Sequence, residues 1–145
     1  MRALEPWGIM LLRVTLGVIF VMHGYLGLWV IGPAGIGGYT IGMGYPPALA
    51  TALAWYLIVA HLGGGALLVL GLWTRWAALA QVPIMASATF LHHWKQGFFL
   101  RGLILDATRG QAIAGGYEFT LLILVATVAL VFLGGGALAL DGRRR

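Results

Sequence analysis

Six ionisable side chains interrupt stretches of the sequence that are otherwise apolar: Arg13, His23, His61, His92, His93 and Glu118. Imidazole and carboxylate groups can exchange protons and form hydrogen bonds with a ligand. A polar group inside a membrane is costly and usually faces protein or a water-filled cavity, so each is a candidate site residue. The alternative for a single buried histidine such as His61 is a structural bond to a backbone carbonyl.

Four apolar windows must position these side chains: residues 7–31, 50–73, 76–93 and 117–140. The chain is 61% hydrophobic and 9% charged, whereas soluble domains are about half apolar and about a quarter charged. A helix needs about 20 apolar residues to cross a bilayer core about 30 Å thick. The sequence therefore predicts an all-α fold, an integral membrane four-helix bundle, with residues 1–145 as a single four-transmembrane-helix domain.

The distribution of cations predicts how these spans are oriented. With the N-terminus inside, Arg2, Arg75 and residues 143–145 are cytoplasmic. The outer loops then carry fewer cations, which favours both termini inside. The net charge of +5 comes largely from the terminal arginines, which favours an anchor to anionic lipid over a nucleic-acid surface. The absence of cysteine excludes disulfides and thiolate ligands.

The motif LGGGAL occurs at residues 62–67 and again at 133–138. A tandem duplication would make the chain two helical hairpins; alternatively, small residues recur because they let membrane helices pack closely. Two segments outside the windows also have a predicted form. The uncharged, glycine-rich segment 32–49 suits a loop folded back on the bilayer surface, and FFLRGLIL at 98–105 is typical of a short interfacial helix.

Helix rise predicts that four of the polar residues gather in the outer half of the bundle. His23 lies about 24 Å along the first window, and His92 lies at a similar distance along the third. His61 falls about 16 Å below the outer start of the second window, while Glu118 lies near the outer surface. One residue from each helix therefore points to a shared polar cavity.

A quinone headgroup is the ligand that this cavity suits best. It needs hydrogen-bond donors for its carbonyls, a proton-exchanging group and apolar walls for its tail, and histidine with glutamate supplies the polar part. His61 could donate to a carbonyl or relay protons inward. Zinc or iron is the alternative, but the sequence has no Glu-x-x-His pair and no HExxH motif, so no metal site is predicted.

The third window has one polar edge, formed by Gln81, Met85, Ala88 and His92 at helical spacing. His93 would point about 100° away from His92, so the two are not expected to serve one site. Pro83 should kink this helix and free a carbonyl near Gln81.

Two further charged residues are expected near the inner side of the bundle. Arg13 lies about 9 Å above the inner end of the first window. It is expected to reach lipid phosphate or to pair with Asp141 as a structural polar residue, like Gln81. The functional alternative is that Arg13 stabilises an anionic ligand on this side.

The order of several segments resembles the DoxX family of small four-helix bacterial membrane proteins. The segments are LLRVTLGVIFVMHG (11–24), GYTIGMGYPPALA (38–50), GGGALLVLGLWTRWAAL (63–79), GGYEFTLL (115–122) and the terminal ALALD (137–141). The family usually has a glutamate before the glycines of helix 2 and a lysine after the HG of helix 1. Here those positions hold His61 and, approximately, Gly27.

The resemblance implies a protein of the bacterial cytoplasmic (inner) membrane that works with other chains. Some relatives are membrane subunits of thiosulfate:quinone oxidoreductases or associate with other redox complexes, and the missing lysine and glutamate argue against a thiosulfate reaction here. We therefore expect an accessory membrane subunit of a redox or respiratory complex that interacts with quinone through His23, His61, His92 and Glu118. The alternative is a non-catalytic scaffold that packs against larger membrane proteins.

Overall fold

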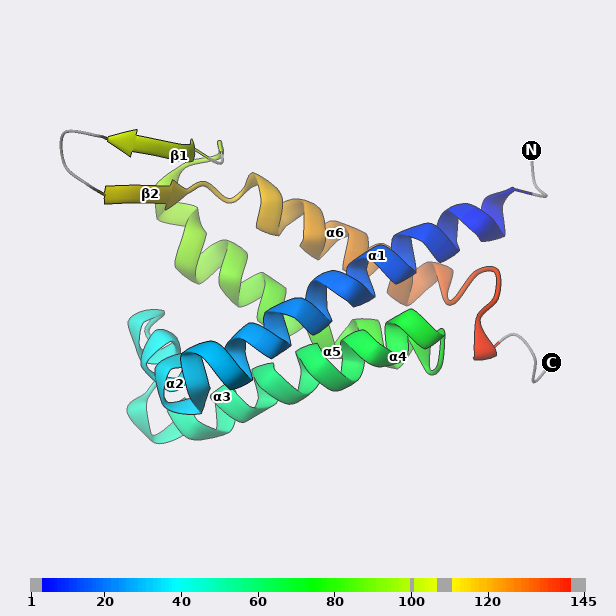
Figure 1. Ribbon diagram of the computed structural model, residues 1–145, viewed down its shortest axis with the longest axis horizontal. Helices are drawn as coiled ribbons and strands as arrows, with labels where there is room; N and C mark the ends of the chain where they lie inside the picture. The colour runs from blue at the N-terminus through cyan, green and yellow to red at the C-terminus, as the bar shows by residue number, and fades with distance from the viewer. Residues whose placement is uncertain (1–3, 100, 107–110, 142–145) are drawn as a thin grey trace.

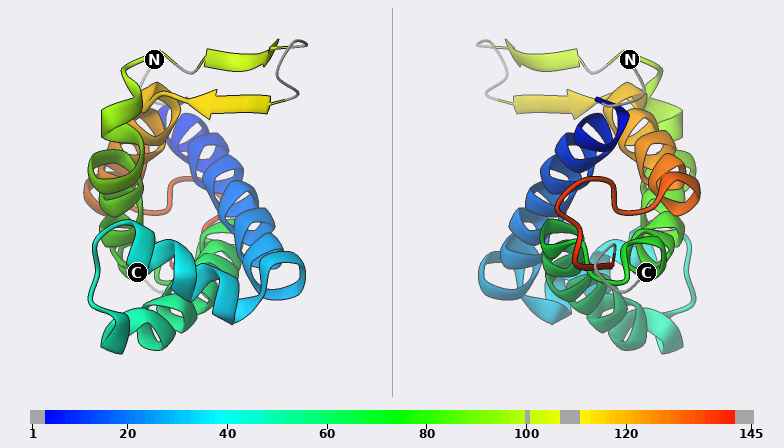
Figure 2. Two further views of the ribbon diagram at one scale, coloured as in Figure 1. Left: turned by 90° about the vertical axis from the view of Figure 1, so that its left-hand side faces the viewer. Right: turned by 90° about the vertical axis from the view of Figure 1, so that its right-hand side faces the viewer.

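The computed structural model describes residues 4–99, 101–106 and 111–141, with the backbone alone for the two strands. Four helical rods form a closed ring in which the first packs on the second, the second on the third, the third on the fourth and the fourth on the first. Figure 2 looks along these rods and shows the ring from both ends. The prediction of four helices is confirmed, and several of their boundaries are corrected below.

The first two rods form one helical hairpin. α1 (Glu5–Tyr25) continues into the π-helical turn η1 (Leu26–Ile31). The second rod is continuous from the 3-10 turn η2 (Pro47–Leu49) through α3 (Ala50–Val59), the π-helical turn η3 (Ala60–Gly64) and α4 (Gly65–Leu70). It ends at Gly71, whose φ of 67° is a left-handed cap that glycine adopts without strain.

The segment between these rods is helical, so the prediction of a loop over 32–49 is wrong for its first part. α2 (Gly32–Gly42) begins where Gly32 adopts a φ of 77°, which breaks the line of α1. α2 then packs on α3 across one end of the molecule (Figure 1). Pro33 stands in the first turn of α2, where its missing N–H costs no hydrogen bond.

The third and fourth rods form the second hairpin. The third comprises α5 (Thr74–Ser87) and the π-helical turn η4 (Ala88–His93), followed by the 3-10 turn η5 (Trp94–Gln96). Strands β1 (Arg101–Asp106) and β2 (Gln111–Gly115) pair antiparallel before α6 (Glu118–Leu133), which packs along α5. The interfacial helix expected at 98–105 is therefore replaced by a strand from Arg101 onward, because that part of the backbone pairs with β2.

α6 ends at Leu133, so the fourth predicted span, 117–140, is too long. Gly134 and Gly136 have φ values of 81° and 67°, and Leu138 has a φ of 55°. The backbone therefore leaves the helix, and residues 134–141 fold back against the start of α1, where the Ala137 N–H donates to the Pro6 carbonyl. The two LGGGAL copies consequently differ in structure: the first is helical and the second is a turn.

Glycine lets α1 approach the second rod closely. A Cβ atom at Gly17 would lie 2.8 Å from the Gly65 carbonyl oxygen, and one at Gly24 would lie 2.7 Å from the Leu62 nitrogen. Both distances are too short for a side chain, so the two backbones touch at two points seven residues apart. Dispersion between closely packed backbones is what holds helices together in lipid.

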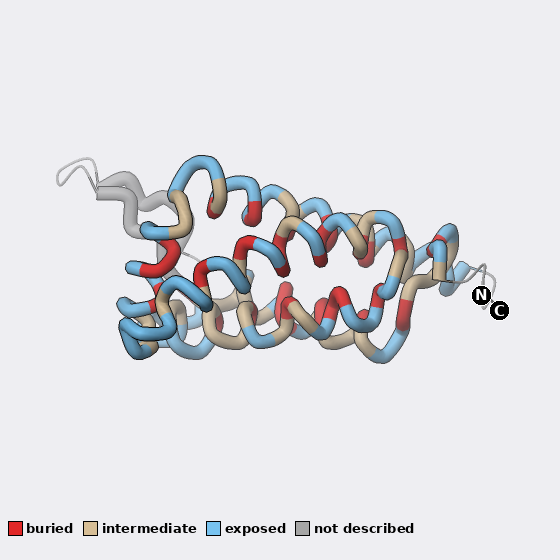
Figure 3. Tube along the Cα trace, turned by 90° about the horizontal axis from the view of Figure 1, so that it is seen from below, coloured by how far each residue is buried: buried red, intermediate tan, exposed pale blue. Residues whose placement is uncertain are grey.

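The described side chains are distributed as expected for a lipid solvent. Many large apolar side chains are exposed, with Trp76 and Phe132 more than 70% exposed, whereas several polar side chains are buried: Arg13, Thr40, His61, Thr74, Gln81, Thr89 and Thr127. Figure 3 shows that buried and exposed positions alternate along each rod. By length and apolar composition, the stretches 5–42 and 47–70 could each cross a membrane, and α6 is a shorter apolar helix. The outward apolar surface fits these stretches being surrounded by lipid.

The two ends of the ring differ, and we name them for their contents. At the terminal end, the start of α1 meets residues 134–141 and the α4–α5 turn. At the loop end lie α2 and the β-hairpin (Figure 1). Arg2 and residues 143–145, which the charge argument used, lie outside the described residues.

Candidate functional site

A cavity of about 420 Å³ lies inside the loop-end half of the ring. Residues from every rod and from α2 line it, among them Phe20, His23, Tyr39, His61, Met85, His93 and Thr120. We call it the histidine cavity. Its volume falls within the range of about 300–1,000 Å³ that small-molecule sites occupy, and its apolar walls with a few polar groups are typical of such sites.

All three π-helical turns in the described part of the chain contribute to this cavity. η1 provides Leu26, Gly27 and Ile31, η3 provides His61, and η4 provides Ala88 and His93. A π turn carries an extra residue compared with an α turn and is found frequently at functional sites. The cavity therefore lies where three rods are locally widened.

His61 is held in a fixed hydrogen-bond chain. Its ring is 5% exposed, and its Nδ1 lies 2.8 Å from Gln81 Oε1. The Gln81 Nε2 in turn donates to the Ala60 carbonyl, and Gln81 is fully buried. Gln81, which the sequence predicts to be a structural polar residue, therefore orients the imidazole of His61.

His23 lies beside His61 at the edge of the cavity. The two rings meet edge to face with their centroids 6.4 Å apart, and the Phe20 ring lies 5.2 Å from that of His61. His23 Nδ1 lies 2.9 Å from the Ile19 carbonyl oxygen, one helical turn earlier. His23 is exposed, so it lies at the opening of the cavity while His61 lies at its base.

His93 lines the cavity, and His92 does not, which reverses the prediction for this pair. Residues 88–93 form a π turn with i→i+5 hydrogen bonds, so the face set by Gln81 and Met85 shifts by one residue before it reaches the histidines. His92 instead packs its ring against Tyr39, with centroids 4.4 Å apart. α-Helical spacing alone could not reveal this shift.

Glu118 is not among the residues that line the cavity. It is the first residue of α6, and its backbone N–H donates to the Phe98 carbonyl at 3.0 Å. The next two residues, Phe119 and Thr120, line the cavity instead. Of the four predicted site residues, the structure therefore brings together His23 and His61 and leaves His92 and Glu118 outside the lining.

A backbone carbonyl close to Pro83, where the sequence predicts a kink, has a hydrogen-bond donor that the sequence did not reveal. The Tyr56 hydroxyl donates to the Ala80 carbonyl at 2.6 Å, three residues before Pro83. Nearby, the Tyr45 and Ser87 hydroxyls lie 2.6 Å apart. Tyr56 could not be identified as this donor from the sequence, because that requires knowing which rods are in contact and at which residues.

Arg13 is at the opposite, terminal end and binds backbone carbonyls. The guanidinium is 1% exposed and donates to the carbonyls of Leu68 and Val69 at the end of α4 and to those of Gly135 and Ala137. Helix C-termini leave carbonyls without intrahelical donors and attract cations. These carbonyls take up the donors of the guanidinium, and Arg13 interacts with Asp141 through the attraction of their charges.

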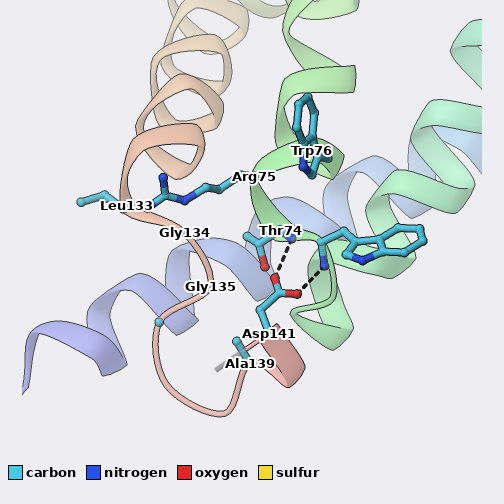
Figure 4. A pocket seen from close by; sticks show the side chains of 10 residues that line it. Thr74, Arg75, Trp76, Leu133, Gly134, Gly135, Ala139 and Asp141 are labelled. Carbon is cyan, nitrogen blue, oxygen red and sulfur yellow. Dashed lines mark hydrogen bonds between the residues drawn. The ribbon is translucent and has the colours of Figure 1, made fainter. Parts of the chain in front are cut away.

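Asp141 caps α5 from a distant part of the chain. Its carboxylate accepts from the backbone N–H groups of Trp73 and Thr74 at 2.7 and 2.8 Å (Figure 4). Burial acts to raise the pKa of Asp141, but the N–H donors of Thr74 and Trp73 and the positive charge of Arg13 outweigh it, so the pKa is lowered from its ordinary value of 3.8.

Arg13, Asp141 and residues 134–137 together form what we call the terminal latch. It closes one wall of a second pocket of about 390 Å³, which Figure 4 shows with Arg75 and Trp76 on its other side. The polar atoms of Asp141 in this pocket are committed to the cap of α5. The terminal latch therefore joins residues 134–141 to α1 and to the start of α5.

A metal site has no support in the described part of the chain. No group of three or more histidine, aspartate or glutamate side chains there is arranged to hold a metal ion. The histidine cavity contains histidine nitrogens and no lining carboxylate. The cavity therefore offers hydrogen-bonding groups set among apolar walls.

The comparisons with known proteins show the family of the chain and name no ligand. A family model described as DoxX matches residues 8–94, which include His23, His61 and most of the cavity lining. An uncharacterized protein of Haemophilus influenzae is 31% identical over 142 residues, covering 96% of this chain and 92% of the relative. No solved structure matches the chain.

Proposed function

The chain belongs to the DoxX family of membrane proteins, and we propose that it is a multi-pass accessory subunit of a redox or respiratory complex that binds a quinone in the histidine cavity. The observation that carries this proposal is a cavity of about 420 Å³ with apolar walls and an oriented, buried imidazole at its base. A planar headgroup with two polar oxygens and an apolar tail suits such a site.

The position of the cavity supports the same proposal. His23, at the edge of the cavity, is exposed on the outer surface of the rods. A lipid-soluble ligand could therefore enter sideways from the bilayer and reach His61 without crossing water. Two apolar residues near the same edge, Leu26 and Ile31, would then contact the tail.

Quinone-linked electron transfer in membranes that contain each variant as the sole copy tests this function. His61→Leu should lower the rate by about tenfold, the effect expected when a ligand loses one buried hydrogen bond. His92→Leu is the matched control, since His92 lies outside the cavity lining. Wild-type turnover in His61→Leu, with assembly shown to be intact on a native gel, would contradict the proposal.

The scaffold alternative is supported by a different surface. A groove of about 620 Å³ runs between α3, α4 and α5 and is lined by Trp55, Gly63, Trp76 and Ala80, with Gly63 open to space. If the chain acts only as a scaffold, Gly63→Trp should abolish co-purification with partner subunits while His61→Leu leaves it unchanged. Retention of partners in Gly63→Trp would argue against this groove as the contact.

A further inference from the structure

We infer that the histidine cavity prefers the reduced, hydroxyl-bearing form of its ligand, a hydroquinone, over the oxidised quinone. This inference rests on the proposed function, because it specifies the oxidation state of the ligand that the same cavity takes. It departs from the expectation that His61 donates a hydrogen bond to a carbonyl. The basis is the direction of the hydrogen bonds around the two histidines.

The Ala60 carbonyl fixes the direction of the chain at His61. A carbonyl oxygen can only accept, so the Gln81 group facing Ala60 must be the NH₂. The Gln81 oxygen therefore faces His61 Nδ1, and because that oxygen also only accepts, Nδ1 carries the hydrogen. In the neutral ring Nε2 is then a hydrogen-bond acceptor.

Nothing along the cavity favours a second proton on His61. The lining contains no aspartate or glutamate to compensate a positive charge, and its other ionisable members are His23, His93 and Tyr39. A buried charge without a partner is costly. Among the described residues, the hydrogen bond of His61 is made by Nδ1, and Nε2 is not one of the fully buried atoms that lack a partner, so its lone pair is open to a ligand.

His23 repeats the same arrangement. Its Nδ1 lies 2.9 Å from the Ile19 carbonyl, which can only accept, so Nδ1 carries the hydrogen and Nε2 of the neutral ring accepts. The Thr120 hydroxyl likewise uses its one hydrogen on the Tyr117 carbonyl. The polar lining of the cavity is therefore rich in acceptors.

His93 Nδ1 lies 3.0 Å from Gln96 Oε1, so in this orientation its Nδ1 carries the hydrogen and its Nε2 accepts as well. Tyr39 is then the side chain of the lining that donates. It lies on α2, on the wall of the cavity that also carries Ile36, and it has a hydroxyl hydrogen to offer. A quinone would find one donor there, and its second carbonyl would face imidazole lone pairs. A hydroquinone can donate to His61 and still accept from Tyr39, so the reduced form satisfies more of the buried groups.

The inference can be tested by binding duroquinol and duroquinone to the purified protein in nanodiscs without oxygen, read from tryptophan fluorescence. We expect duroquinol to bind at least about tenfold more tightly, since the oxidised form leaves the Nε2 acceptor of His61 without a donor. In His61→Leu this preference should disappear, while His92→Leu should keep it. Equal or tighter binding of duroquinone by wild type would overturn the inference and leave the proposed function standing.

Failure of both compounds to bind would instead contradict the proposed function itself. A second measurement reads the tautomer of the wild-type ring without any ligand: ¹⁵N NMR of histidine-labelled protein, which contains four histidines. The His61 resonance, assigned by its loss in His61→Leu, should show a protonated Nδ1 and an unprotonated Nε2. A hydrogen on Nε2 would overturn the inference.

Discussion

At the scale of single residues, the direction of a hydrogen bond decides what a buried polar group can do. His61 and Gln81 were both identifiable in the sequence as polar residues in apolar windows. The hydrogen bond between them could not be identified in the sequence, because the two residues are 20 positions apart and lie on different rods. The sequence therefore identified both residues as candidates, whereas the partner that makes Nε2 of His61 an acceptor could be found only from the packing.

Asp141 makes stability depend on pH in a defined direction. Because its pKa is lower in the folded chain than the ordinary 3.8, its contribution is present above about pH 4 and is lost as the pH falls through the folded value. Thermal unfolding in detergent should show wild type more stable than Asp141→Asn at pH 6 and the two converging below about pH 4. Glu5→Gln is the control variant, because it also removes one carboxylate but leaves the hydrogen bonds of Asp141 in place. A constant gap down to pH 3 would refute this role.

Arg13 should be intolerant even of lysine. A guanidinium offers five donors in a planar fork, whereas an ammonium cannot reach carbonyls on both α4 and the 134–137 turn. Arg13→Lys should therefore lower the free energy of unfolding by roughly 2–4 kcal/mol. Arg75→Lys, at an exposed cation of the same end, should change it by under about 0.5 kcal/mol. Equal effects in chemical unfolding would contradict the terminal latch.

At the scale of elements, the sequence predicted the helices well and their irregular turns poorly. Apolar length alone located all four rods, because a helix is the only way for one segment to satisfy its backbone in lipid. The π turns follow no apolar period, so His93 was assigned to the wrong face. The turn after Leu133 was missed because its glycines have positive φ, while the same LGGGAL motif is helical in the second rod.

Close approach between α1 and η3 predicts a sharp effect at Gly24. A Cβ there would lie 2.7 Å from the Leu62 nitrogen, next to His61. Gly24→Leu should cost roughly 1–3 kcal/mol of stability by overpacking, and it should weaken binding of the cavity ligand because η3 carries His61. Gly8→Leu, on the same helix with nothing within 4 Å, should do neither. Similar unfolding curves for the two variants would show that α1 and η3 are not in contact.

At the scale of the whole molecule, the two ends of the ring have different tasks. The terminal latch fixes the end where α1 begins and the described chain finishes, and the histidine cavity opens in the other half. We expect the terminal end to face the cytoplasm, as the cation distribution predicts. The cavity would then lie in the outer half of the bilayer.

The absence of cysteine makes this orientation directly measurable. Lys95→Cys introduces a thiol at an exposed position of the loop end, and Arg75→Cys does so at the terminal end. A membrane-impermeant maleimide added to intact cells should label Lys95→Cys, and it should label Arg75→Cys only after the cells are permeabilised. The reverse pattern would invert the predicted orientation.

The central claim, that the histidine cavity binds a quinone or its reduced form, is tested most directly by the protein's own contents. The wild-type chain would be purified gently from its native membrane beside His61→Leu and His92→Leu, and bound lipids and companion subunits would be identified by mass spectrometry. We expect about one quinone-class molecule per chain in wild type and in His92→Leu, as for a single ligand in one pocket, and its loss in His61→Leu. Stable companions with no quinone in any sample would contradict the claim and leave this chain as a scaffold.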